Sequence, residues 1–285
     1  MRNSCLVLLL IFAATFFPGC FSNERNITLP AGNYDLNNPA KLVLNDALAE
    51  ISGLSFYNRD SSVFAISDEV GSLFKIHLNK GFRTEQWKFD KKRDYEDVVQ
   101  WGNSVYILES NGNIQTLNFS KEGDTIYNKR SIFPGDNKKK NEFESLYYDD
   151  QYKGFVMICK DCEDDTDQFT TAYIYDPASD SFHFPLFRID LKQIARQIGD
   201  TKIKFRPSAA TINPLTNDVW IVSSTNELIV VIDRKGTVKD VYTLKPGIFN
   251  QPEGITFTPW GDLIICNEAG DKYNSSTLLI FKPKK

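Results

Sequence analysis

The sequence predicts an all-β protein, a β-propeller of about five four-stranded blades, with six as the alternative number. A short motif starts at residues 50, 94, 142, 206 and 251, so its copies lie 44, 48, 64 and 45 residues apart. This spacing is typical of propeller blades. Aromatic residues make up 13% of the chain, a composition that favours strands over helices.

Each copy of the motif begins the first strand of a blade, and further strand-like segments follow it. The motifs read EISGL (50–54), DYEDV (94–98), EFESL (142–146), RPSAA (206–210) and QPEGI (251–255). The second segments (63–66, 105–108, 155–158, 219–222 and 263–266) are almost continuously apolar, as expected for strands that neighbouring blades cover on both faces. Third segments follow at 73–78, 114–119, 172–175, 228–232 and 278–281, and more polar fourth segments at, for example, 86–89 and 241–244.

The two ends of the chain are predicted to close the ring together. The fifth unit ends after its third strand, and the strand-like segment KLVL (41–44) lies before the first motif. This segment can supply the missing outer strand, which leaves no unpaired edge at the seam. The long third unit has room for an insertion, and LKQIARQI (191–198) has helical spacing. We expect one short helix there; a sixth blade hidden in this unit is the alternative.

Residues 1–19 are expected to be a signal peptide. Residues 6–17 form an apolar stretch too short for a membrane span, which needs about 20 residues. It ends in FPGC (17–20), which resembles a bacterial lipobox, although Phe17 replaces the usual leucine. Cys20 would then carry a lipid, residues 20–38 would be a tether, and residues 39–285 the propeller domain. The alternative is an ordinary signal peptide followed by a coincidental cysteine.

These features predict a lipoprotein of the bacterial cell envelope, at the outer membrane or the periplasmic face. The formal net charge is −4 and there is no basic stripe, so nucleic acid is not an expected partner. We expect a monomer that contacts the membrane through the lipid on Cys20 and binds an unknown small molecule or another envelope protein.

Propeller geometry gathers carboxylates at one mouth of the central channel. The start of the first strand and the end of the second strand of a blade meet at the same face of the ring, close to the channel. A hard divalent cation with oxygen ligands, Ca²⁺ above all, would offset the repulsion between carboxylates crowded there. The predicted metal ligands are Glu96, Glu144, Glu253, Asp68 and Glu109.

Other polar residues at the same level would contact an organic ligand. These are Asn267, Glu268, Ser224, Lys160 and Arg206. Two alternatives to a metal site stay open: the carboxylates could accept backbone N–H bonds and cap neighbouring loops, or they could surround an organic ligand with Lys160 and Arg206 as partial counter-charges.

Few residues carry a signal for catalysis. Cys159 and Cys162 form a CxxC that is either a small-loop disulfide or a chance pair. His77 and His183 fall in a third and a fourth strand, far from the channel, so a Ser-His-Asp triad or a histidine base has little support. No catalytic residue is assigned.

Taken in order, the five motifs and the hairpin NPLTNDVW (213–220) resemble the SdiA-regulated (YjiK-like) family of bacterial propeller proteins over about residues 40–283. The resemblance implies the fold and the envelope location; it does not imply an activity. Asp97 stands where the family tends to have glycine. The architecture is also similar to NHL-repeat and gluconolactonase-type propellers, and the latter hold a metal at the channel mouth with Glu, Asn and Asp.

Two functions follow as hypotheses. The first is a non-enzymatic binding or interaction module on the envelope, with a divalent cation at the channel mouth. The second is a Ca²⁺-dependent hydrolase of the lactonase or phosphoesterase type, in which the ion acts as a Lewis acid and a mouth carboxylate as the base. The first is preferred because the chain has only two histidines and no distinctive acid–base pair.

Overall fold

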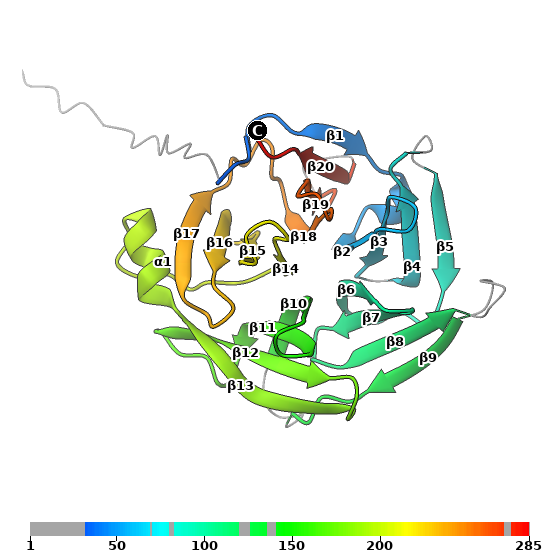
Figure 1. The fold of residues 1–285 in the computed structure, drawn as a ribbon, viewed down its shortest axis with the longest axis horizontal. Coiled ribbons are helices and arrows are strands. Elements are labelled where there is room, and N and C mark those ends of the chain that lie inside the picture. The colour runs from blue at the N-terminus through cyan, green and yellow to red at the C-terminus, as the bar shows by residue number, and fades with distance from the viewer. Residues whose placement is uncertain are drawn as a thin grey trace, which may run out of the picture.

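The chain folds into a ring of five four-stranded antiparallel sheets over the residues that a computed structural model describes, 32–68, 70–79, 83–119, 126–135, 141–270 and 275–284 (Figure 1). The prediction of a five-bladed propeller is confirmed. The alternative prediction of a sixth blade is wrong, because the third unit holds one four-stranded sheet. Its extra length lies partly in long strands, since β11 and β13 run for 9 and 10 residues.

The blades follow the chain order. Blade 1 consists of β2 (Ile51–Tyr57), β3 (Ser62–Ser67), β4 (Val70–His77) and β5 (Thr84–Lys88); blade 2 of β6 (Tyr95–Trp101), β7 (Ser104–Glu109), β8 (Ile114–Phe119) and β9 (Ile126–Ser131); blade 3 of β10 (Asn141–Asp149), β11 (Gly154–Cys162), β12 (Phe169–Asp176) and β13 (Ser181–Asp190). Blade 4 consists of β14 (Ala209–Ile212), β15 (Val219–Ser223), β16 (Leu228–Ile232) and β17 (Val238–Thr243); blade 5 of β18 (Pro252–Phe257), β19 (Leu263–Asn267), β20 (Thr277–Phe281) and β1 (Ala40–Val43).

The ring closes as the sequence predicts. Strand β1 pairs antiparallel with β20, from Ala40 opposite Ile280 to Val43 opposite Thr277. The propeller also begins earlier than residue 39, because part of the expected tether packs on blade 5. Tyr34 is buried, bridges to Pro283, and donates its hydroxyl proton to the Gly261 carbonyl over 2.6 Å. Residues 1–31, with the expected signal peptide and Cys20, lie outside the described residues.

The insertion in the third unit is the helix α1 (Leu191–Ile198), as predicted. The Asp190 side chain accepts the N–H of Lys192 at its start, and Gly199 ends it in the left-handed region at φ 72°, a conformation that glycine adopts without a steric penalty. Leu191, Ile194 and Ala195 are its buried face. The 3₁₀ turn η1 (Asp46–Leu48) joins β1 to blade 1.

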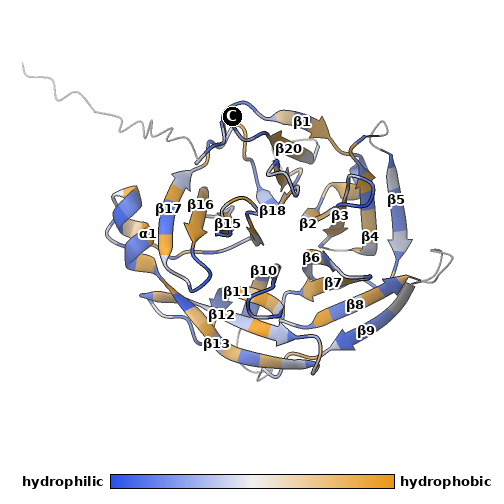
Figure 2. Cartoon of the chain, in the orientation of Figure 1, coloured by the Kyte–Doolittle hydropathy of each residue, from blue (hydrophilic) through white to orange (hydrophobic). Residues whose placement is uncertain are grey.

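The hydrophobic core consists of five layers, and each layer lies between two neighbouring blades. The second strands supply most of it: every residue of β3, β15 and β19 is buried. In Figure 2 the outer strands β5 and β9 are largely hydrophilic, which suits strands with one face toward solvent. The layer between blades 1 and 2 is the smallest, with eight buried apolar residues.

The inner strands β2, β6, β10, β14 and β18 surround the channel side by side. Glycine permits the close approach on either side of β2. A Cβ on Gly53, whose φ is +64°, would lie 2.6 Å from the Cα of Asp97, and one on Gly254 would lie 2.9 Å from the carbonyl carbon of Gly53. The glycines of the first and fifth motifs are therefore needed for blades 5, 1 and 2 to meet at the channel.

Candidate functional site

A β-bulge at the start of the inner strands holds the mouth carboxylates. In blade 2, Tyr95 lies opposite Glu109 and Asp97 lies opposite Leu108, so Glu96 is an extra residue with no partner across the ladder. Glu144 of blade 3 and Glu253 of blade 5 occupy the same bulge position. Bulges re-aim side chains and recur next to functional sites. The repeated motif therefore delivers three glutamates at one level of the channel.

The mouth gathers further carboxylates from blades 1 and 5. Glu50 lies just before β2, Asp68 just after β3, and Glu268 just after β19. One carboxylate oxygen from each lies within 4.8 Å of the others. Asp68 and Glu268 are half-buried and Glu50 is exposed, so this set lies at the rim. Glu268 is electrostatically coupled to Glu253 and Glu96 as well.

Burial and mutual repulsion raise the pKa values of Glu96 and Glu268 into the range where carboxylates are normally charged. Burial, together with the charges of Asp94, Glu253 and Asp68, raises the pKa of Glu96 to about 8. Burial and the neighbouring Glu253 and Glu50 likewise raise the pKa of Glu268 to about 8. A positive charge placed between Glu96 and Glu268 would lower both pKa values, since it favours the ionised carboxylates.

Glu253 is electrostatically coupled to both Glu96 and Glu268. Burial raises its pKa, while hydrogen bonds with the hydroxyls of Ser208 and Ser224 oppose the shift. Its carboxylate is thus in contact with blade 4 and electrostatically coupled to Lys160 and Asp68. Of the predicted ligand-binding residues, Ser224 therefore belongs to the mouth.

Lys160 is the cation that reaches the mouth from blade 3. It forms an ion pair with Glu144 and a second one with Glu142 at 3.2 Å, and its charge lowers the pKa values of Glu96 and Glu253. The ladder leaves Lys160 without a partner, since Phe143 lies opposite Cys159 and Glu142 opposite Asp161. Lys160 therefore compensates part of the negative charge of the mouth, from the side of blade 3.

The CxxC is a disulfide. Cys159 and Cys162 are bonded with their Cα atoms 5.9 Å apart, so the bond spans the bulge that presents Lys160. Arg206 lies next to this loop, where it binds Asp161 at 3.3 Å. This places Arg206 beside Lys160 at the junction of blades 3 and 4, with its guanidinium directed to Asp161.

Glu109 and Asn267 do not join the cluster. Glu109 is buried in blade 2 and accepts a pair of hydrogen bonds from Arg130 on β9 and one from Gln115 at 2.8 Å. These bonds outweigh burial and bring the pKa of Glu109 below its ordinary value. Asn267 donates its amide protons to the Ile248 carbonyl, in the segment between β17 and β18, and to Thr277 of β20. Both follow the regular strand alternation, which turns their side chains into the blade.

Sequence reasoning missed Glu50 and Asp97. Glu50 opens a motif whose first position is polar in all five copies, and that regularity was the available signal. Asp97 is 2% exposed and accepts the N–H groups of Val98 at 2.8 Å and Leu146 at 2.7 Å. It ties the inner strands of blades 2 and 3 together, at the position where the first motif has Gly53.

The two histidines lie away from the mouth, as predicted. His77 is in β4 and bonds to Glu85 at 2.7 Å, and His183 is in the outer strand β13. In the part of the chain that the structure describes, no helix is long and apolar enough to cross a membrane.

The sequence matches no protein-family profile and no curated protein. Among solved structures, the glutaminyl cyclase of Myxococcus xanthus is similar: 13% identity, a TM-score of 0.58, and coverage of 86% of this chain and 96% of that one. A luciferin-regenerating enzyme is similar at 9% identity, with a TM-score of 0.53 and coverage of 86% and 95%. Likeness at such identity establishes the propeller fold alone.

Proposed function

We propose that this protein is a non-catalytic binding module of the bacterial envelope and that its channel mouth binds a divalent cation, Ca²⁺ in the first place. The observation that carries the proposal is the convergence of Glu50, Asp68 and Glu268, with one oxygen from each within 4.8 Å of the others. Ca²⁺ takes 6–8 oxygen ligands in flexible geometry, and carboxylates that come from different blades suit it. Water and an organic ligand would complete the coordination.

The charge balance of the mouth supports a cation rather than an anion. Glu96 and Glu268 each reach a pKa of about 8 because of burial and neighbouring carboxylates. A bound divalent ion would release these protons and replace repulsion by attraction. The same ion could bridge the mouth to a carboxylate or hydroxyl of the module's partner.

Thermal unfolding tests the proposal. The melting temperature of the purified protein should rise with added Ca²⁺ and fall with EDTA, because a ligand that binds only the folded state stabilises it by mass action. Glu268→Gln should weaken the Ca²⁺ affinity about tenfold or more, the loss expected for one charged ligand. Glu227→Gln, at an exposed turn of blade 4, is the matched control and should bind as the wild type does. A Ca²⁺ response that Glu268→Gln leaves intact would contradict the site.

A Ca²⁺-dependent hydrolase of the lactonase or phosphoesterase type is the second candidate. The observation in its favour is that Glu96, with a pKa of about 8, can give or take a proton near neutral pH. Hydrolysis of lactones or phosphoesters that requires Ca²⁺ and disappears in Glu96→Gln or Glu253→Gln would replace the first proposal with the second. Ca²⁺ binding without turnover of any of these substrates would exclude the second.

The envelope location and the likeness to the SdiA-regulated family belong to the proposal as well. Their support is in the sequence: the apolar stretch 6–17, Cys20 after FPG, and the order of the five motifs. Incorporation of labelled palmitate by the wild type, but not by Cys20→Ser, would support the anchor. Equal labelling of both would contradict it.

A further inference from the structure

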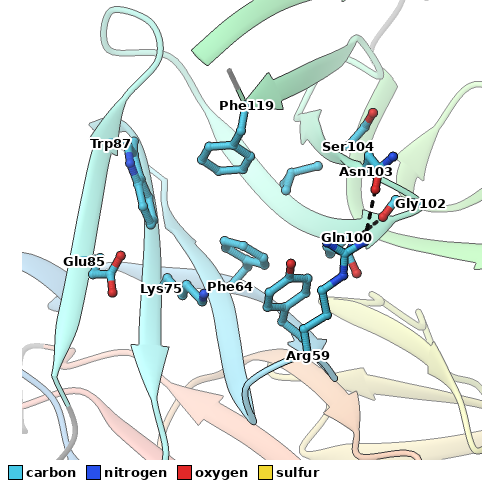
Figure 3. A pocket seen from close by; sticks show the side chains of 12 residues that line it. Arg59, Phe64, Lys75, Glu85, Trp87, Gln100, Gly102, Asn103, Ser104 and Phe119 are labelled. Atoms are coloured by element: carbon cyan, nitrogen blue, oxygen red, sulfur yellow. Dashed lines mark hydrogen bonds between the residues drawn. The ribbon is translucent and has the colours of Figure 1, made fainter. Parts of the chain in front are cut away.

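A second cavity lies at the other face of the ring, between blades 1 and 2. Its volume is about 400 Å³, within the range of small-molecule sites. The hairpin turns β2–β3 and β6–β7 form its rim, at the ends of the inner strands that begin at the channel mouth. Figure 3 shows the aromatic side chains around the space and the guanidinium of Arg59 at its edge. The aromatic residues are Tyr57, Phe64, Trp87 and Phe119.

The cavity exists because blade 2 presents small side chains where blade 3 presents rings. Gln100 and Val105 face each other across β6–β7, just as Tyr148 and Phe155 do across β10–β11. At the junction of blades 2 and 3 the Tyr148 ring stacks on Trp101 with centroids 4.4 Å apart, and the Phe155 and Tyr106 centroids are 4.0 Å apart.

The junction of blades 4 and 5 is filled in the same way. Trp220 packs there against Phe257, with ring centroids 5.5 Å apart. At these two junctions an aromatic side chain therefore occupies the place that Gln100 takes between blades 1 and 2, whereas Val105 has valine counterparts in Val63 and Val219. The space also accounts for the small size of this layer of the core.

The basic side chains around the cavity outnumber the acidic ones by one. Lys75 forms an ion pair with Asp60 at 2.6 Å and lies 4.8 Å from the centroid of the Tyr57 ring. Glu85 is bound by His77 and Arg83. The remaining cation is Arg59.

Arg59 is exposed and reaches the opposite wall. Its Nη2 donates to the Oδ1 of Asn103 over 3.1 Å, and its guanidinium lies 5.9 Å from the centroid of the Tyr57 ring. Within the described ranges, none of the ion pairs involves Arg59. A guanidinium offers five N–H donors in a planar fork that fits a carboxylate, so this group is available to an anionic ligand.

We infer that this cavity binds a small planar aromatic anion, an arene carboxylate of one or two fused rings. The rings would lie among Phe64, Trp87 and Phe119 with the carboxylate on Arg59. Aromatic walls favour a flat ring system, the volume limits its size, and the charge of Arg59 selects the anion. The site is separate from the channel mouth and does not depend on the cation proposed there.

Calorimetric titration with 2-naphthoate and with the neutral 2-naphthamide tests this inference on the purified protein. The anion should bind with a Kd below about 1 mM, a modest affinity for a ligand of this size, and at least about tenfold more tightly than the amide, the value of one charged hydrogen-bonded pair. Arg59→Gln should remove that preference. Lys153→Gln, at the matching turn of blade 3, should keep it.

A filling variant tests the origin of the space. Gln100→Tyr with Val105→Phe places the residues of blade 3 into blade 2 and should weaken 2-naphthoate binding more than tenfold. A cooperative thermal unfolding transition close to that of the wild type serves as its folding control; if the double variant does not fold, Gln100→Tyr alone is used. The inference is overturned by a wild-type Kd above 1 mM, by a folded filling variant that binds as the wild type does, or by equal affinities for the acid and the amide.

Discussion

Glu96 and Glu109 lie on adjacent strands of one blade, and their surroundings are opposite. Glu109 receives hydrogen bonds from Arg130 and Gln115, and its pKa lies below the ordinary value. Glu96 has other carboxylates as neighbours, and burial first and then these charges raise its pKa to about 8, although Lys160 compensates part of the effect. A buried acid that the fold itself neutralises is part of the structure, whereas one that the fold leaves uncompensated is free to respond to protons and cations.

Loss of the Arg130 side chain should have the largest effect. Arg130→Gln removes the bidentate partner of a buried carboxylate, so the free energy of unfolding at pH 7 should fall by about 2 kcal/mol, the size of a charged hydrogen-bonded interaction. Urea denaturation measures it. The double variant Glu109→Gln/Arg130→Gln should lose less than the sum of the two single variants. A loss for Arg130→Gln below about 0.5 kcal/mol would mean that Glu109 is not neutralised in this way.

The second largest effect should be on the pH dependence of stability, to which Glu109 and Glu96 contribute with opposite signs. The lowered pKa of Glu109 gives stability that is present above its unfolded value of about 4.5 and is lost as the pH falls through the folded value. The raised pKa of Glu96 acts in reverse: stability falls as the pH rises from 4.5 to about 8.

Glu96→Gln should therefore remove part of the alkaline loss. Without a divalent cation, its melting temperature at pH 9 should exceed that of the wild type by about 3 °C or more, the change that about 1 kcal/mol produces in a domain of this size. Near pH 4 the two proteins should melt alike. Saturating Ca²⁺ should also reduce the difference at pH 9. Equal melting temperatures at pH 9 without the cation would refute the uncompensated state of Glu96.

The disulfide should have the smallest effect. Cys159 and Cys162 span the bulge that presents Lys160, and Lys160 lowers the pKa of Glu96. Cys159→Ser/Cys162→Ser should loosen Lys160. The pH at which half of the alkaline loss of stability has occurred should then rise by less than one pH unit, about the shift that a weakened ion pair produces. Lys160→Gln should move it further in the same direction. An unchanged midpoint in both variants would show that Lys160 does not act on Glu96.

The sequence predicted the topology because the propeller motif repeats locally. Motif spacing gave the five blades, the 41–44 segment gave the closing strand, and the position of Glu96, Glu144 and Glu253 in the motif put them at one mouth. Glu109 was misplaced because both faces of β7 are buried, so its apolar pattern does not show which face turns into the blade. Its partner Arg130 lies two strands further on, so only the folded blade reveals the pair.

The second cavity shows the same limit. Gln100 and Val105 are unremarkable in a sequence, and the space appears only when they are compared with Tyr148 and Phe155 in the same register of the next blade. The volume depends on what the adjacent blade places opposite them. Such differences between repeats are invisible to a motif search, which retains only what the repeats share.

The pairing of β1 with β20 has a consequence for biogenesis. Tyr34 and the Gly261 carbonyl that it contacts are 227 positions apart, and β1 pairs with β20, so blade 5 cannot be completed until the chain has been synthesised through β20. Until then the edges of β1 and β19 stay open, and an open edge is a template for association with other chains. Premature termination before residue 277 would thus be expected to yield aggregates rather than a four-bladed protein, and a holding chaperone would be most useful in that interval.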